Sequence, residues 1–240
     1  MNSKYRQSEQ LVEIKKGETG YGLLIEHDGH ITAKQDMINQ IKEDIDNHNK
    51  FVIPDNFIVS AVFQKYGIKN ANGRIYPEDI LKREVAKYIE QKVRTNSAIS
   101  ALDHPASSAL SGHDVSHRIL DLRWDGHTLV GEMKLHLSPG YIRYGIIGTS
   151  GDKVANMILD GIQLGVSSRG VGGVVEKFGV SYVDDTFELC AFDVVCEPST
   201  PSALIKQNPE DLRPFIESDI SRNGNTLSEK IDRIGKILCI

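Results

Sequence analysis

Residues 119–137 read ILDLRWDGHTLVGEMKLHL, and they carry the strongest indication of the fold class. Two apolar-rich runs flank Asp125-Gly126, a dipeptide that tolerates the positive φ angles of a tight hairpin turn. The pattern predicts one strand over residues 119–124 and a second over residues 128–137. Because the connection is so short, the two strands must pair antiparallel.

Strand patterns also dominate the sequence on both sides of this hairpin. Four more segments have the composition of strands: residues 57–63, 171–178, 180–183 and 187–195. The second and third of them flank Gly179 and are expected to form another hairpin. Helices are predicted between them, one beginning at Pro77 and one over residues 152–159. Strands with scattered helices predict an α+β fold with a mainly antiparallel sheet or small barrel wrapped by helices.

The chain divides into three zones, and no internal repeat is evident. Residues 1–50 are polar, with one helix predicted from the spacing of Met37, Ile38, Ile41 and Ile45. Residues 51–206 form the expected folded body. Residues 207–240 are expected to be a tail that ends in a short helix.

The composition excludes several classes of protein. The 240 residues are 40% hydrophobic and 25% charged, which is typical of a soluble globular protein. A net charge of −5 argues against nucleic-acid binding, and no apolar run is long enough for a transmembrane helix. The polar start of the chain lacks a signal-peptide core, and the three cysteines do not suit a disulfide framework. We therefore expect a cytoplasmic protein.

The most distinctive local feature is the string GVSSRG, residues 165–170. Small residues on both sides of Ser167 suit a tight turn with an exposed hydroxyl group, and glycines leave backbone N–H groups accessible to an oxyanion. Ser167 is thus a candidate nucleophile. A glycine-rich turn with no chemical role is the alternative interpretation.

Two further residues could complete a catalytic set. His104 precedes Pro105, which favours an extended backbone that aims the imidazole, although a loop histidine without a chemical role is the alternative interpretation. Asp193 lies inside an apolar strand, where a buried carboxylate needs a partner such as a His N–H. The alternative interpretation is a carboxylate that caps a nearby turn or pairs with an arginine. Ser167, His104 and Asp193 together would supply the nucleophile, base and orienting acid of a hydrolytic triad. The order His–Ser–Asp differs from those of the chymotrypsin, subtilisin and α/β-hydrolase folds.

A metal hydrolase is the competing chemical interpretation. His104, His113 and His117 are close enough in the sequence to suggest zinc, but the HExxH pattern of the zinc proteases is absent. We expect no metal ion and no cofactor.

Five sequence strings together resemble the prohead proteases of tailed bacteriophages, in the branch typical of myoviruses. They are Asn72-Gly73-Arg74-Ile75-Tyr76-Pro77, Leu102-Asp103-His104-Pro105, Trp124-Asp125-Gly126, residues 165–170, and Asp193-Val194-Val195 followed by Pro198-Ser199. They cover roughly residues 55–205, in the family's order and at similar spacing. The resemblance implies a serine protease domain over residues 51–206, with a fold related to that of the herpesvirus assemblins.

The resemblance also implies roles for individual residues. His104 matches the family's catalytic His, and Ser167 matches its nucleophile, with Ser168 as the rival. Asp193 lies where the third member is expected, and Ser168, Arg169 and Gly170 lie where neighbours that stabilise the oxyanion are expected.

The function implied by the resemblance is capsid maturation during virion assembly. Such an enzyme would act in the host cytoplasm, inside the assembling prohead, on scaffold or core proteins, on the major capsid protein and on itself. Self-association inside the prohead is compatible with this role, and no nucleic acid or membrane is involved. The resemblance also implies cleavage after Glu with Leu or Ile two residues earlier. Leu227-Ser228-Glu229 and Leu11-Val12-Glu13 match this pattern. The alternative is a non-catalytic scaffold or capsid-core protein that keeps the protease fold.

Overall fold

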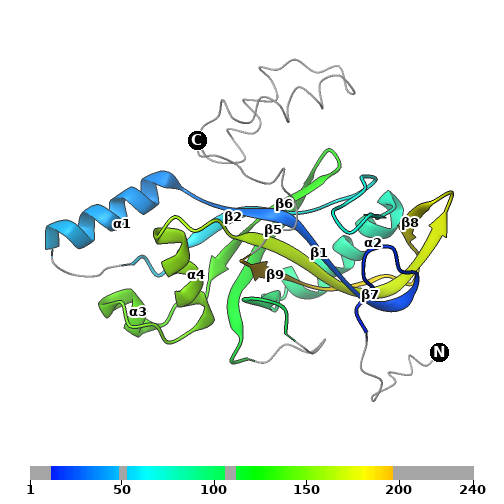
Figure 1. The fold of residues 1–240 in the computed structure, drawn as a ribbon. Helices are drawn as coiled ribbons and strands as arrows, with labels where there is room; N and C mark the ends of the chain where they lie inside the picture. The colour runs from blue at the N-terminus through cyan, green and yellow to red at the C-terminus, as the bar shows by residue number, and fades with distance from the viewer. Residues whose placement is uncertain (1–11, 49–52, 106–111, 197–240) are drawn as a thin grey trace.

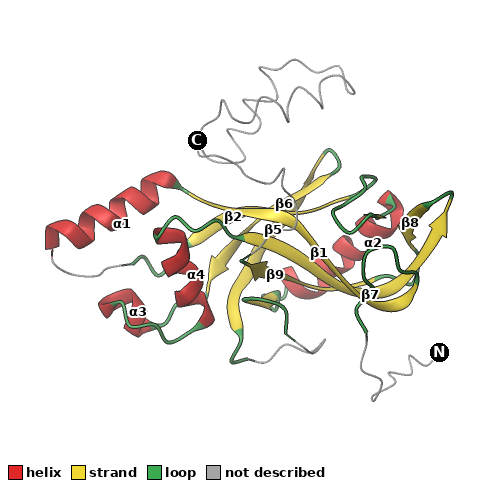
Figure 2. Ribbon diagram, viewed as in Figure 1, coloured by secondary structure: helices red, strands yellow, loops and turns green. Residues whose placement is uncertain are grey.

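The computed structural model describes residues 12–48, 53–105 and 112–196 of the chain (Figure 1). These residues form nine strands, four α-helices and one π-helical turn. The fold is α+β and mostly antiparallel, as the sequence predicted, and its strands form two sheets (Figure 2). The tail expected over residues 207–240, with its short helix, lies outside the described residues.

The strands are β1 (Gly20–Ala33), β2 (Ile58–Lys65), β3 (Arg74–Ile75), β4 (Ile99–Ala101), β5 (Val115–Asp125), β6 (Thr128–Leu135), β7 (Gly165–Lys177), β8 (Val180–Val183) and β9 (Glu188–Val195). The helices are α1 (Gln35–His48), α2 (Glu78–Tyr88), the π-helical turn η1 (Ile89–Val93), α3 (Pro139–Tyr144) and α4 (Ser150–Leu159). The helix expected around Met37, the helix that begins after Pro77 and the helix over residues 152–159 are all present.

Strand β1 joins the two sheets. The strand order is β3-β8-β7-β1-β2-β6-β5-β4. The remaining strand, β9, pairs with β7 and lies outside this linear order. A register shift between Glu26 and Gly29 bends β1, so that most of the strand pairs with β7 and its last residues pair with β2. At the other end of the order, an isolated parallel bridge joins Leu102, just after β4, to Val194 of β9.

The sequence did not predict β1, which lies in the zone expected to hold one helix. Its glycines and charged residues interrupt the alternation that marks a strand. The buried carboxylate of Glu26 is accommodated because Arg74 Nη1 donates to it at 2.6 Å and the Tyr76 hydroxyl at 2.9 Å. The boundary expected at residue 50 therefore does not separate the first zone from the sheet.

Both hairpins predicted from the sequence are present. Gly126, between β5 and β6, has a φ of +57°, and Phe178 and Gly179, between β7 and β8, have φ angles of +53° and +74°. In the β7–β8 turn both central residues have positive φ, which matches the twist of the flanking strands. Local sequence was therefore sufficient to place these two turns.

Helices α3 and α4 are held by side chains at their first turns. The Ser138 hydroxyl accepts a hydrogen bond from the backbone N–H of Tyr141, at the start of α3. Thr149 and Asp152 form a capping box at the start of α4. The buried carboxylate of Asp152 also accepts from the backbone N–H of Ser138 at 2.8 Å, which ties the two helices together. Helix α3 was not predicted from the sequence, although Ser138-Pro139 is a helix-start signal.

Aromatic side chains fill the core between the sheets and α2. Phe192 of β9 makes edge-to-face contacts with Phe63 of β2 and Tyr88 of α2, at centroid distances of 5.1 Å and 5.5 Å. Figure 1 shows α1, α3 and α4 at one end of the long strands, and α2 and β8 at the other. This packing fixes β9 and β7, the two strands on which the candidate site is built.

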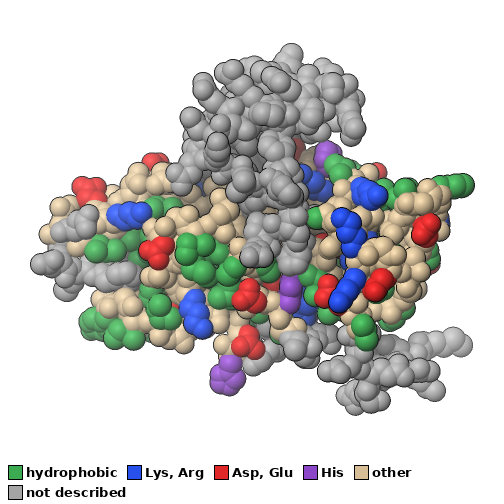
Figure 3. Space-filling view, in the orientation of Figure 1, with side chains coloured by type: hydrophobic (Ala, Val, Ile, Leu, Met, Phe, Trp, Pro, Cys, Tyr) green, Lys and Arg blue, Asp and Glu red, His purple; other side chains and the backbone are tan. Residues whose placement is uncertain are grey.

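No helix among the described residues is long and apolar enough to cross a membrane. On the face drawn in Figure 3, the coloured acidic and basic side chains are interspersed with apolar ones.

Candidate active site

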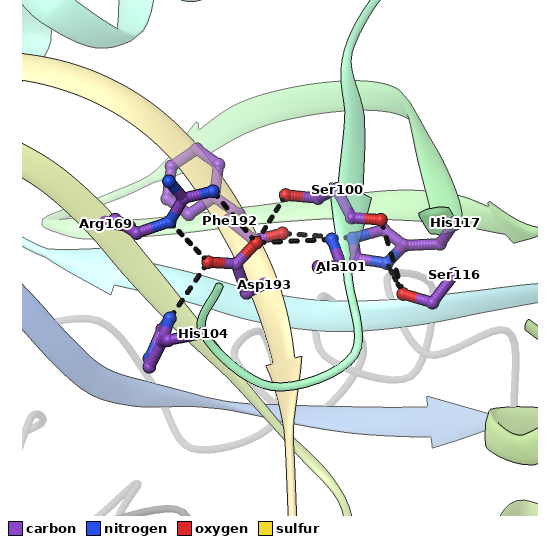
Figure 4. A network of polar contacts seen from close by, with 8 residues as sticks. All are labelled: Ser100, Ala101, His104, Ser116, His117, Arg169, Phe192 and Asp193. Carbon is purple, nitrogen blue, oxygen red and sulfur yellow. Dashed lines mark hydrogen bonds and ion pairs between the residues drawn. The ribbon is translucent and has the colours of Figure 1, made fainter. Parts of the chain in front are cut away.

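The carboxylate of Asp193 is the centre of a buried polar network (Figure 4). Its Oδ2 atom lies 2.9 Å from His104 Nδ1 and accepts a 2.8 Å hydrogen bond from Arg169 Nε. Its Oδ1 atom accepts from Ser100 Oγ at 2.9 Å and from the backbone N–H of Ala101 at 3.2 Å. Asp193 therefore has both of the partners that the sequence analysis considered, a histidine and an arginine.

These partners determine the charge of Asp193. Burial alone would raise the pKa of this carboxyl, because it disfavours the charged form. The hydrogen bonds from His104 and Arg169, together with the charge of Arg169, outweigh burial and lower the pKa to about 2. Asp193 is thus a carboxylate at neutral pH.

The chain that follows β4 delivers His104 to this carboxylate. The Leu102–Val194 bridge and a 2.7 Å hydrogen bond from the Asp103 N–H to the Val194 carbonyl hold this segment against β9. Asp103 has a φ of +60°, a left-handed conformation that Asp adopts more readily than most residues. The chain reverses there, and the next side chain, His104, turns back to Asp193.

The contact with Asp193 also sets the tautomer of His104. An ionised carboxylate can only accept hydrogen bonds, so Nδ1 of the imidazole must be the donor. In a neutral ring the lone pair is then on Nε2. His104 is 16% exposed, so its ring lies at the edge of the buried network. This is the tautomer that a general base oriented by a carboxylate requires.

The sheet register separates Ser167 from its neighbour Ser168. Ser167 in β7 is paired with Asp193 in β9, whereas Ser168 is paired with Phe192. Paired residues of an antiparallel ladder point to the same face, and successive residues point to opposite faces. Ser167 therefore shares a face with Asp193, and Ser168 points to the face of the aromatic core. The Ser167 hydroxyl is buried and makes no hydrogen bond within the described part of the chain.

The expectation that residues 165–170 form a turn is wrong. They begin β7, which is paired with β1 on one side and β9 on the other. The glycines of this strand allow close packing. A Cβ on Gly170 would lie 2.4 Å from Cε2 of Phe187, and a Cβ on Gly172 would lie 2.7 Å from its Cα. A sequence that permits a turn here instead lets an aromatic residue press against the strand.

The three residues expected to flank the site have different environments. The Arg169 side chain is buried against Asp193, Gly170 packs against Phe187, and Ser168 lies on the opposite face of β7. An oxyanion role for this group stays a prediction.

His117, a second buried histidine, lies beside this network (Figure 4). Its Nε2 donates to the carbonyl of Phe192 at 3.0 Å, and its Nδ1 is 2.9 Å from Ser116 Oγ. Burial lowers the pKa of His117 to about 4, against weaker opposing effects of the Asp193 charge and the Phe192 carbonyl. His117 is thus neutral at pH 7, with both ring nitrogens engaged.

Sequence reasoning missed the supporting residues of the site. Ser100 and Ala101 lie in a short strand that no pattern indicated, and Arg169 was expected beside the nucleophile, not on the carboxylate. The sequence signal for Arg169 is the buried Asp193 itself, because a buried carboxylate needs a partner such as an arginine.

Within the described ranges, no group of three or more His, Cys, Asp or Glu side chains could hold a metal ion.

Comparison with known protein families identifies the class of protein to which this chain belongs. Residues 16–212 match the family of prohead core protein serine proteases, a longer stretch than the motifs alone cover. The chain belongs to this family and is a serine protease of capsid assembly.

Two relatives come from bacteriophage T4. The chain is 32% identical to the T4 prohead core protein protease over 167 residues, which is 68% of this chain and 74% of the relative. It is also similar to the solved structure of the T4 capsid assembly protease, gp21, with a TM-score of 0.58 and 25% identity. That comparison covers 73% of this chain and 98% of the T4 chain.

Proposed function

We propose that Ser167, His104 and Asp193 are the catalytic triad of this protease. The hydroxyl oxygen of Ser167 attacks the carbonyl carbon of the scissile peptide bond, and its proton passes to Nε2 of His104. The imidazolium then gives that proton to the leaving amine as the C–N bond breaks. Water hydrolyses the resulting acyl-enzyme with the same base, and Asp193 orients the ring throughout.

The observation that carries this proposal is the pairing of Ser167 with Asp193 across two strands, together with the 2.9 Å contact between Asp193 and His104. A nucleophile and the acid that orients its base are thereby directed to one face of the sheet. The same register excludes Ser168 from that face, because adjacent strand residues alternate.

We further propose that the substrates are the scaffold or core proteins and the major capsid protein of a phage, and that the enzyme also cuts itself. It would act inside the assembling prohead in the host cytoplasm, where copies of it can associate. Support comes from the family and from the name of the T4 relative, a prohead core protein protease.

We also propose that the strands close into a barrel like that of the herpesvirus assemblins. The bridge from Leu102 to Val194 supports it, because this bridge links β9 to the segment that follows β4. The strands from β9 through β7, β1, β2, β6 and β5 to β4 then form a closed path.

The test is digestion of purified prohead scaffold protein by the wild type and by Ser167→Ala, followed on a gel. We expect the alanine variant to be folded and slower by about 10⁴-fold or more. A chelator included in a parallel reaction should leave the wild-type rate unchanged. Scaffold that is cleaved equally fast by Ser167→Ala would overturn the assignment of the nucleophile.

A further inference from the structure

The proposed triad has a buried arginine attached to its acid. We infer that Arg169 is a positioning residue of this protease: it locks the Asp193 carboxylate in the orientation that holds His104, and its charge keeps the resting imidazole available as a base. This inference rests on the proposed triad, because it gives Arg169 a role through Asp193 and His104.

The geometry shows how the carboxylate is locked. Arg169 Nε donates to Oδ2 at 2.8 Å, and Arg169 Nη2 is 3.5 Å from Oδ1, so the guanidinium faces both oxygens. Ser100 Oγ and the Ala101 N–H bind Oδ1 from the β4 side. Rotation of the carboxylate would break several of these contacts at once. Oδ2 is therefore held toward Nδ1 of His104.

The strand register explains how Arg169 reaches Asp193. Arg169 lies two residues after Ser167, so both side chains lie on the Asp193 face of β7. Arg169 itself is paired with Ala191, and Asp193 is its diagonal neighbour two residues along β9. One strand thus supplies both the nucleophile and the group that fixes the acid.

The charges show why an arginine matters for the base. Arg169 and Asp193 are 1% and 0% exposed, so water screens their charges poorly. With neutral His104, the two form a pair with no net charge. Without the guanidinium, the whole negative charge of Asp193 would act on the imidazole and favour its protonated form. Arg169 therefore opposes the effect of the Asp193 charge on the imidazole.

Two substitutions separate the orienting effect from the charge effect. Arg169→Lys keeps the charge but loses the planar fork, and Arg169→Gln keeps a donor but loses the charge. Rates are measured against pH on a peptide with the sequence of residues 222–234, which contains Leu227-Ser228-Glu229. In parallel, the His104 ring is titrated by NMR in a Ser167→Ala background, where no proteolysis occurs.

We expect Arg169→Gln to move the midpoint of the His104 titration, and the acid limb of the rate profile, upward by roughly one pH unit or more. Arg169→Lys should leave both midpoints near the wild-type position and lower kcat by about 10-fold to 100-fold with little change in KM. A purely structural arginine would instead lower stability without moving either midpoint.

Arg74 supplies the matched control. It is also a buried arginine bound to a buried carboxylate, that of Glu26, but Glu26 is paired with Ser168 and so faces away from Asp193. Arg74→Gln should lower the thermal stability while both midpoints stay in place.

An unmoved His104 midpoint in folded Arg169→Gln would overturn the inference. If that variant does not fold, Arg169→Lys decides, and wild-type kcat in it would contradict the role. Failure of the triad itself gives a different result, namely an active Ser167→Ala.

Discussion

Ser167 and Asp193 stand directly opposite each other on the neighbouring strands β7 and β9, whereas Ser168 stands opposite Phe192. The two serines are adjacent in the sequence, and both are buried. Their side chains nevertheless leave β7 on opposite faces. Of the two serines, therefore, only Ser167 shares a face with Asp193.

Ser168→Ala should retain proteolysis within about 10-fold of the wild type, because its hydroxyl does not share a face with Asp193, whereas loss of a triad nucleophile costs at least about 10⁴-fold. The measurement is the initial rate of scaffold cleavage, with circular dichroism as the check on folding. A dead Ser168→Ala beside an active Ser167→Ala would reverse the assignment of the nucleophile.

The rate of proteolysis should rise with pH through about 6.5–7.5, as a histidine base loses its proton. His104→Ala should abolish this rise together with most of the activity. Asp193→Asn should be impaired by about 10⁴-fold, less than the loss from removing Ser167 or His104, because Asp193 orients the ring and transfers no proton. The comparison is made on the pH–rate profile of each variant, and an Asp193→Asn enzyme as fast as the wild type would exclude Asp193 as the third member.

Acid should destabilise the fold through Asp193. Its pKa is lowered from an ordinary 3.8 to about 2, since the hydrogen bonds and charge of its partners outweigh the opposing effect of burial. Above pH 4 the carboxylate is charged in both the native and the unfolded chain, so its stabilisation is complete. As pH falls from about 4 to about 2, the unfolded chain binds the proton first, and stability on the order of 2 kcal/mol is lost.

The check is urea unfolding of the wild type and Asp193→Asn at several pH values between 2 and 5. The variant should start less stable, because Arg169 loses its counter-charge, and should show a weaker pH dependence over this range. Parallel curves for the two proteins would contradict the role of the Asp193 charge.

His117 should act on stability at higher pH. Burial lowers its pKa from 6.5 to about 4, so between these values the unfolded chain binds a proton that the native protein does not. Stability should therefore rise from pH 4 to pH 6.5, by on the order of 3 kcal/mol for this group. In His117→Gln that rise should shrink by about this amount, as measured by unfolding free energies at each pH. A rise of undiminished size would show that His117 is not the cause.

The C-terminal tail should contain a site of self-processing. Leu227-Ser228-Glu229 has the cleavage pattern that the family resemblance implies, with Leu two residues before the Glu after which the chain is cut. Mass spectrometry of incubated wild-type protein should find a product that ends at Glu229, and Ser167→Ala should not yield it. A tail that stays intact after scaffold has been fully digested would rule out this site.

Much of the fold could be predicted from local sequence. The two hairpins, β9 and three of the helices follow from alternation, from helical spacing and from turn residues whose backbone preferences act within a few positions. The strand β1 could not be predicted in this way. Its buried Glu26 is stabilised by Arg74 and Tyr76, which lie about fifty residues away in the chain, and no local pattern records that pairing.

The sequence by itself determined which residue types were available for chemistry: a serine among small residues, a histidine before proline, and an aspartate in an apolar strand that had to find a partner. The tertiary structure alone decided how they are used. The register of β7 against β9 chose the face of Ser167 over that of Ser168, and it brought Arg169 to Asp193. Such choices depend on contacts between distant strands, where a shift of one residue exchanges the two faces, so the linear order of residues does not reveal them.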